Sequence, residues 1–182
     1  MISCEQAAAV LAEADCLYTS DEVETALQTM ADDITARLAD ADMLFLSVMN
    51  GGLVPAAGLL SRLQFPLQLD YLHATRYRGG TSGQSLDWLH KPATALSART
   101  VLVVDDILDE GITLAAILEY CRQQGVAEVY SAVLVQKKHD RCLHNMQADF
   151  TGLMVEDRYV FGCGMDYYGY HRNLTGIYAV KE

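Results

Sequence analysis

The stretch VLVVDDILDEGIT, Val101 to Thr113, decides the fold of this chain. Its first four residues are apolar without polar alternation, the pattern of a strand buried on both faces of a parallel sheet. The acidic pair Asp105 and Asp106 follows at once. Open α/β sheets bind ligands at the carboxyl ends of their strands. We therefore expect the residues from Asp105 onward to form a binding site at the end of a central strand.

A turn and a helix follow this strand. Gly111 permits a turn that a Cβ would hinder, and Thr113 can supply both an N-cap oxygen and a hydroxyl group for a phosphate. Apolar residues then recur at helical spacing as far as Gly125, which predicts the helix end. Free N–H groups at the start of a helix favour an anion, so phosphate is the expected ligand. The carboxylates of Asp105 and Asp106 instead suit ribose hydroxyls or Mg²⁺.

A second strand, glycine turn and helix lie upstream. The apolar run Met43 to Met49 predicts another buried strand, and it leads into Asn50, Gly51 and Gly52 before the next helical pattern. This is either a second anion-binding corner or a simple tight turn, because glycine pairs mark both.

Composition narrows the class of protein. With 182 residues, 51% of them hydrophobic, the chain is expected to form one domain around one core. The net charge of −11 argues against a nucleic-acid partner, which needs a basic face. No apolar run approaches the length of a membrane span, so we expect no membrane partner. Five cysteines without a CxxC pair, and no visible signal peptide, predict reduced thiols in a cytoplasmic protein.

The stretch Val101 to Thr113 resembles the phosphoribosyl-diphosphate (PRPP) signature of the type I phosphoribosyltransferases. In that signature a strand ends in two acids, followed by two residues, an acid, a variable residue, Gly, another variable residue and Thr. The resemblance extends over about residues 43 to 178 and, within the family, is to the hypoxanthine-guanine phosphoribosyltransferases. It implies a parallel, Rossmann-like α/β sheet flanked by helices. A single domain over residues 1–182 would have a core at about 40–140, and a small hood from N-terminal segments and about 145–182.

The implied activity is transfer of the 5-phosphoribosyl group from PRPP to N9 of hypoxanthine or guanine. The products would be IMP or GMP and pyrophosphate, with Mg²⁺ as the cofactor. The resemblance makes Asp109 the catalytic residue, beside N7 of the purine. It implies that PRPP is bound by Asp105, Asp106, Asp109, Glu110, Gly111, Ile112 and Thr113. Glu110 stands where the family commonly has Ser or Thr, so its side chain must point away from the phosphate.

The family resemblance also assigns the purine site. Lys137, placed ahead of its neighbour Lys138, would donate to O6 of the base, and Phe150 would stack on it. The implied purine-binding set is Lys137, Phe150, Thr151 and Asp157. A donor at O6 leaves the amine of adenine without a partner, so adenine should be rejected.

Pyrophosphate and metal sites complete the implied active site. Pyrophosphate would be bound by Asn50, Gly51 and Arg172, although the family often has Lys or Arg in place of Asn50. A non-proline cis peptide would join Met49 to Asn50. Magnesium would be held by Asp105, Asp106 and Asp157.

A run of small polar residues, GGTSGQS at 79 to 85, is either a surface loop or an active-site lid. The family has a mobile flap here whose Ser-Tyr pair covers the substrate, and this chain offers Arg76 and Tyr77. Such a lid would exclude water from the reacting sugar. Family members are usually dimers or tetramers, which implies a homodimer or homotetramer.

Two alternatives stay open. The chain could be a phosphoribosyltransferase for another base, such as a xanthine-guanine enzyme, because a lysine donor at O6 also accepts xanthine. It could instead be a nucleotide-sensing regulator of the same fold that binds RNA or DNA. A chain with 13 Lys and Arg against 24 Asp and Glu has little material for the basic surface that the regulator needs.

Overall fold

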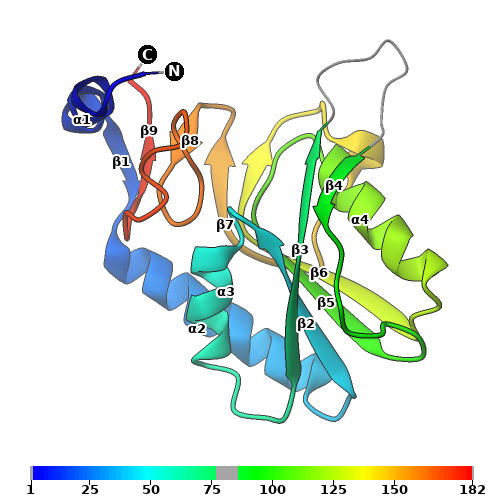
Figure 1. Cartoon of the computed structure of the whole chain (residues 1–182). Coiled ribbons are helices and arrows are strands. Elements are labelled where there is room, and N and C mark those ends of the chain that lie inside the picture. The colour runs from blue at the N-terminus through cyan, green and yellow to red at the C-terminus, as the bar shows by residue number, and fades with distance from the viewer. Residues whose placement is uncertain (1, 77–85, 182) are drawn as a thin grey trace.

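The computed structural model describes residues 2–76 and 86–181 (Figure 1). Its main layer is a six-stranded sheet with the strand order β4-β3-β2-β5-β6-β7. The strands are β2 (Met43–Met49), β3 (Gln68–Arg76), β4 (Leu86–His90), β5 (Thr100–Leu108), β6 (Glu128–Lys138) and β7 (Phe150–Glu156). All neighbours pair in parallel except β3 and β4. The predicted parallel α/β sheet is confirmed.

Helices cover both faces of this sheet. Helices α2 (Ser20–Leu38) and α3 (Leu53–Leu60) pack on one face, and α4 (Ile112–Gln123) packs on the other (Figure 1). Because strand side chains alternate between faces, Phe45 of β2 joins the α2 side and Leu44 the α4 side. The two apolar cores together sandwich the central strands.

Strand β5 lies in the middle of the sheet, between β2 and β6. The residues Val101 to Val104 are fully buried, as their unbroken apolar pattern predicts. Asp105 pairs in register with Val133 of β6, and Leu108 pairs with Gln136. The acidic residues therefore follow the buried half of the strand and reach the carboxyl edge of the sheet.

The helix after β5 begins one residue before the predicted cap. Gly111 has a φ of 77° and is the N-cap residue of α4, so the expected N-cap role of Thr113 is wrong. A left-handed backbone at this position favours glycine, which explains why the turn contains one. Gly125, with a φ of 76°, follows the C-cap Gln124 and ends the helix as predicted.

A second, three-stranded antiparallel sheet unites the two ends of the chain (Figure 1). It consists of β1 (Asp15–Tyr18), β9 (Ile177–Ala179) and β8 (Val160–Phe161), with α1 (Cys4–Glu13) beside it. A short 3-10 helix, η1 (Leu143–Asn145), lies between β6 and β7 in the sequence. Strand β7 still belongs to the main sheet, so the sheet extends past the boundary expected at about residue 140. None of the helices in the described part of the chain is long and apolar enough to cross a membrane.

Candidate active site

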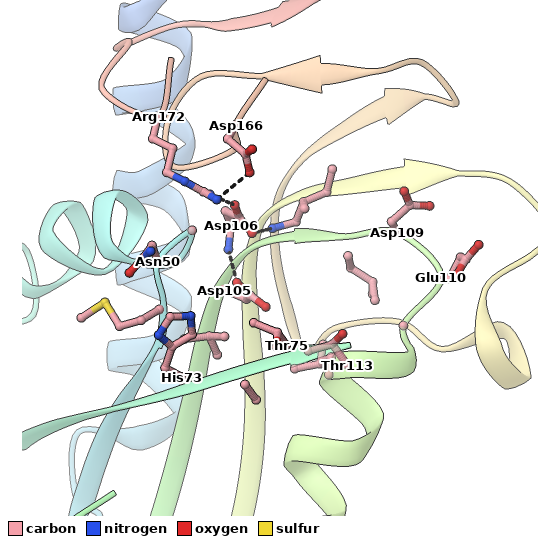
Figure 2. A pocket seen from close by; sticks show the side chains of 18 residues that line it. Asn50, His73, Thr75, Asp105, Asp106, Asp109, Glu110, Thr113, Asp166 and Arg172 are labelled. Atoms are coloured by element: carbon pink, nitrogen blue, oxygen red, sulfur yellow. Dashed lines mark hydrogen bonds and ion pairs between the residues drawn. The ribbon is translucent and has the colours of Figure 1, made fainter. Parts of the chain in front are cut away.

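A cavity of about 360 Å³ opens at the carboxyl edge of the main sheet (Figure 2). Its walls come from the ends of β2, β3 and β5, from the start of α4, and from Asp166 and Arg172 of the segment after β8. Nearly all residues of the predicted PRPP set line it: Asp105, Asp106, Asp109, Glu110, Gly111 and Thr113. Asn50, Gly51 and Arg172, the predicted pyrophosphate set, line it as well.

The glycines of the loop after β2 lie against the backbone of β5 and of the segment after β8, with no room for a Cβ atom. The peptide bond from Met49 to Asn50 is cis, as predicted. A Cβ on Gly52 would lie 2.6 Å from the carbonyl oxygens of both Val48 and Val104. A Cβ on Gly164 would lie 2.1 Å from the carbonyl oxygen of Gly51. Only glycine fits where the segment after β8 meets this loop.

Two carboxyl groups, the half-buried Asp105 and the buried Asp106, stand next to each other near the end of β5. The amide N–H of Asp106 donates to Oδ1 of Asp105 at 2.9 Å, and that of Ile107 donates to Oδ1 of Asp106 at 2.8 Å. Burial, followed by the charge of Asp106, raises the pKa of Asp105 well above its usual value. Burial also raises the pKa of Asp106, although Asp105 and Arg172 oppose the shift. A cation between these groups and a ligand would relieve the cost of their ionisation.

Arg172 joins the two walls of the cavity. One of its nitrogens lies 2.5 Å from Oδ1 of Asp166, and another lies 3.8 Å from Oδ2 of Asp106 (Figure 2). The guanidinium also donates to the carbonyl oxygen of Gly164 at 2.5 Å. Arg172 thereby fixes the segment after β8 over the end of β5 and brings a cation to the acidic cavity.

Asp109 is hydrogen bonded through both carboxylate oxygens. Lys137 Nζ lies 2.9 Å from Oδ2, and Nε2 of His139 lies 2.7 Å from Oδ1. Burial by itself would raise the pKa of Asp109, but the hydrogen bonds from Lys137 and His139 outweigh burial and lower it. Asp109 is therefore ionised at neutral pH and held by two donors.

A smaller cavity of about 240 Å³ adjoins the first. It shares Asp106, Ile107, Asp109 and Asp166 with the larger cavity. Its remaining lining is Lys137, Tyr159, Val160 and Met165. An apolar and aromatic wall with one ammonium group suits a flat heterocycle that carries an oxygen acceptor.

Comparisons with known proteins agree with this geometry. The model of the phosphoribosyl transferase domain matches residues 14–168. The chain belongs to the phosphoribosyltransferase family. It is 30% identical to a hypoxanthine-guanine-xanthine phosphoribosyltransferase of Tritrichomonas foetus, over 91% of each chain. It is 27% identical to a hypoxanthine-guanine phosphoribosyltransferase of Bacillus subtilis, over 91% of this chain and 92% of the relative.

Solved structures of other phosphoribosyltransferases share the fold. A hypoxanthine-guanine-xanthine phosphoribosyltransferase superposes with a TM-score of 0.84 at 28% identity, covering 92% of this chain and 97% of the other. A hypoxanthine phosphoribosyltransferase of Staphylococcus aureus superposes with a TM-score of 0.86 at 23% identity, covering 92% and 91% of the two chains. The predicted type I phosphoribosyltransferase fold is confirmed.

The structure separates the two lysines that end β6 in this phosphoribosyltransferase. The Lys137 side chain is only 12% exposed and lines the smaller cavity, whereas Lys138 is 52% exposed and pairs with Glu156 at 3.1 Å. Successive side chains of a strand point to opposite faces, which accounts for the difference. The choice of Lys137 over Lys138 agrees with this placement.

Phe150 does not lie where the predicted purine-stacking residue should. It begins β7, pairs in register with Ala132, and is buried with the ring of Tyr130 and the guanidinium of Arg37 nearby. This is the far end of the sheet from the carboxyl edge, and Phe150 lines neither cavity. The aromatic residue that does line the smaller cavity is Tyr159. Thr151 also stays inside the sheet, where its hydroxyl bonds Gln136 at 3.2 Å.

Asp157 lies beside the active site and outside both cavities. Arg141 holds its two oxygens at 2.5 and 3.0 Å and lowers the pKa of Asp157 to about 2. Carboxylate and imidazole atoms of Asp157, Asp109 and His139 lie within 4.8 Å of one another. The ammonium of Lys137 already bridges Asp109 and Asp157, however, at 2.9 and 3.7 Å. Asp166, in contrast, lines the larger cavity together with Asp106 (Figure 2).

Other residues of the site were predicted only in part. Ile112 begins α4, although its side chain does not line the cavity. Arg76 ends β3, and Tyr77, its expected lid partner, lies outside the described residues. Sequence patterns gave no role to His73 and Thr75, which line the larger cavity from β3. The spacing of His73 and Thr75 could have identified them, because residues two apart in a strand point to the same face of the sheet.

Proposed function

We propose that this chain is a purine salvage enzyme that transfers the 5-phosphoribosyl group of PRPP to N9 of hypoxanthine or guanine. The products are IMP or GMP and pyrophosphate. The observation that carries the proposal is the common wall of the two cavities, formed by Asp106, Ile107, Asp109 and Asp166. An anion site and a heterocycle site that share this wall hold two substrates next to each other, as a transfer between them requires.

The larger cavity suits PRPP. The backbone from Asp109 to Thr113 opens α4, a helix of 12 residues, and its N–H groups suit the 5′-phosphate. The loop at Asn50 and Gly51, with the guanidinium of Arg172, suits pyrophosphate. Asp105 lies between these two regions and suits the ribose hydroxyls.

The residues present fit a bound Mg²⁺. Carboxylate oxygens are the ligands that this ion prefers, and two adjacent carboxyl groups with raised pKa values gain from a nearby cation. Asp105 and Asp106 would hold it, and Asp166, which lines the cavity, would be the third carboxylate in place of Asp157, which does not. When bound, Mg²⁺ supplies positive charge that stabilises the leaving pyrophosphate. Arg172 provides a further positive charge on the same side of the cavity.

The smaller cavity suits the base. Lys137 donates to O6, the ring of Tyr159 stacks on the purine, and Asp109 faces N7 across the common wall. Lys137 must leave Asp109 to reach O6, which frees one carboxylate oxygen for the base. Asp109 then accepts a hydrogen bond from N7–H or removes its proton as N9 attacks C1 of PRPP. Adenine lacks the O6 acceptor that would draw Lys137 away from Asp109, so it is a poor substrate.

The decisive experiment is a PRPP-dependent assay with hypoxanthine, guanine, xanthine and adenine, with and without Mg²⁺. Wild type and Asp109→Ala are compared, and monophosphate is measured by chromatography. We expect IMP and GMP to form with Mg²⁺, adenine to react poorly, and the variant to lose most of the rate. Xanthine as the best base would favour the xanthine-guanine alternative. If no base reacts while PRPP still binds, the regulator becomes the better explanation.

Assembly as a homodimer or homotetramer, and a cytoplasmic location, stay predictions.

A further inference from the structure

His139 has a buried side chain that the proposed reaction does not yet use. It follows β6, and its side chain is only 4% exposed, against 37% for Asp109. Its Nε2 lies 2.7 Å from Oδ1 of Asp109. A side chain so well covered and so close to the catalytic carboxylate limits where that carboxylate can point.

The backbone determines which nitrogen of His139 carries the proton. The amide N–H of Arg141 donates to Nδ1 of His139 at 3.2 Å. A nitrogen that accepts a hydrogen bond carries no proton, so this contact assigns the proton of the ring to Nε2. Nε2–H is then the donor and Oδ1 of Asp109 the acceptor.

The two donors to Asp109 differ in their access to substrate. Lys137 lines the smaller cavity, and its flexible side chain can turn toward a base. His139 lines neither cavity, and its ring is held from both sides, by Arg141 at Nδ1 and by Asp109 at Nε2. A base that draws Lys137 away from Oδ2 leaves the bond from His139 to Oδ1 intact.

We propose that His139 is a positioning residue for Asp109. Its Nε2–H holds Oδ1 in place, so that Oδ2 faces N7 of the purine once Lys137 has moved to O6. The inference rests on the proposed function. It assigns His139 an effect on the step that involves the base, and none on PRPP binding.

The test compares His139→Ala and His139→Gln with wild type, and Lys138→Ala serves as the neighbouring control. The amide nitrogen of Gln can replace Nε2–H, whereas Ala removes the donor. We expect His139→Ala to lower kcat/KM for hypoxanthine about ten- to a hundredfold, as for loss of a hydrogen bond to a charged group. The KM for PRPP should stay at the wild-type value. His139→Gln should recover most of the loss, and Lys138→Ala should behave as wild type.

The other outcomes are equally informative. Equal losses in the Ala and Gln variants, or a parallel rise in the KM for PRPP, would show a merely structural role and overturn the proposal. Wild-type kinetics in His139→Ala would overturn it too, while leaving the proposed function in place. An inactive wild type would overturn both. The nitrogen NMR spectrum of the imidazole gives a readout independent of turnover: the ring proton should lie on Nε2, and a proton on Nδ1 would contradict the geometry.

Discussion

Gly51 and Asp106 approach so closely that a Cβ added to Gly51 would lie 2.0 Å from Oδ2 of Asp106. The loop after β2 and the end of β5 are therefore fitted to each other at this point. The Asp106 side chain is short and buried, so it cannot yield without leaving its place in the cavity.

Replacement of this glycine should damage PRPP binding more than base binding. We expect Gly51→Ala to lower kcat/KM for PRPP at least tenfold and to reduce the free energy of unfolding by about 1–3 kcal/mol, as overpacking usually does. Steady-state kinetics and urea unfolding measure the two effects. Leu53→Ala, an exposed change at the start of α3, is the control. Wild-type PRPP kinetics in Gly51→Ala would show that PRPP binding does not depend on this position of the Asp106 side chain.

The two aromatic candidates for the base site can be separated by one pair of variants. Tyr159→Ala should raise the KM for hypoxanthine about ten- to a hundredfold, because stacking on a base contributes roughly 1–3 kcal/mol. Phe150→Leu should lower the free energy of unfolding by about 1–2 kcal/mol, since Phe150 is buried in the core, and should leave that KM unchanged. The reverse pattern would restore Phe150 to the site and remove Tyr159 from it.

Loss of the Lys137 ammonium should affect both base affinity and the pH profile. Lys137→Met keeps the length of the side chain, and we expect the KM for hypoxanthine to rise about ten- to a hundredfold. Lys137 helps to lower the pKa of Asp109, so that pKa should be higher in the variant. The acidic limb of the kcat/KM profile then moves to higher pH. Lys138→Met controls for a change at the neighbouring, half-exposed residue. An acidic limb that does not move would mean that Asp109 does not control the profile.

Stability should respond in opposite ways at Asp105 and Asp70. The pKa of Asp105 is raised by burial and by Asp106, so its contribution favours folding at low pH and is lost as the pH rises through the folded pKa. At pH 7.5, without ligands, Asp105→Asn should therefore raise the free energy of unfolding by roughly 0.5–2 kcal/mol and abolish activity. The gain should shrink toward pH 4.

Asp70 is the matched control for this experiment. It accepts hydrogen bonds at 2.7 Å from the N–H groups of Tyr71 and Thr94, which outweigh the effect of burial and lower its pKa. Its contribution is present above the unfolded pKa and is lost as the pH falls through the folded pKa. Asp70→Asn should thus destabilise the protein at pH 7.5, by a difference that fades in acid. Urea unfolding at both pH values measures the two changes. If both variants changed the free energy of unfolding in the same direction at pH 7.5, this account would be wrong.

The sequence predicted the parts of the site that lie in continuous stretches. An apolar run that enters Asp105 and Asp106, and a second that enters Asn50 and Gly51, each specify a strand, a turn and a helix locally. Because carboxyl ends of parallel strands meet at one edge, the two stretches had to converge. Lys137 lies near the end of the next strand, but only the family resemblance assigned it to the base.

The part of the site that comes from β7, β8 and the segment after β8 could not be predicted in the same way. Phe150, Tyr159 and Phe161 are all aromatic residues near strands, and their order along the chain does not say which one faces the base. The pairing of the strands decides which residue faces the base. Pairing with Ala132 puts Phe150 at the start of β7, whereas Tyr159 directly precedes β8 and lines the smaller cavity. The segment after β8 brings Asp166 to the cavity in place of Asp157. Such long-range packing leaves no local pattern.

The common wall between the two cavities has a consequence for inhibitor chemistry. One molecule could place a flat heterocycle against Tyr159 and an anionic arm at the start of α4, because Ile107 and Asp109 border both spaces. Joining the two fragments makes the second binding event intramolecular, and overall affinity can exceed that of either fragment by about 10²–10⁴ when the linker matches the span. Because Ile107 lines both cavities, the linker can be compact and rigid and would hold the two fragments in place with little loss of conformational entropy.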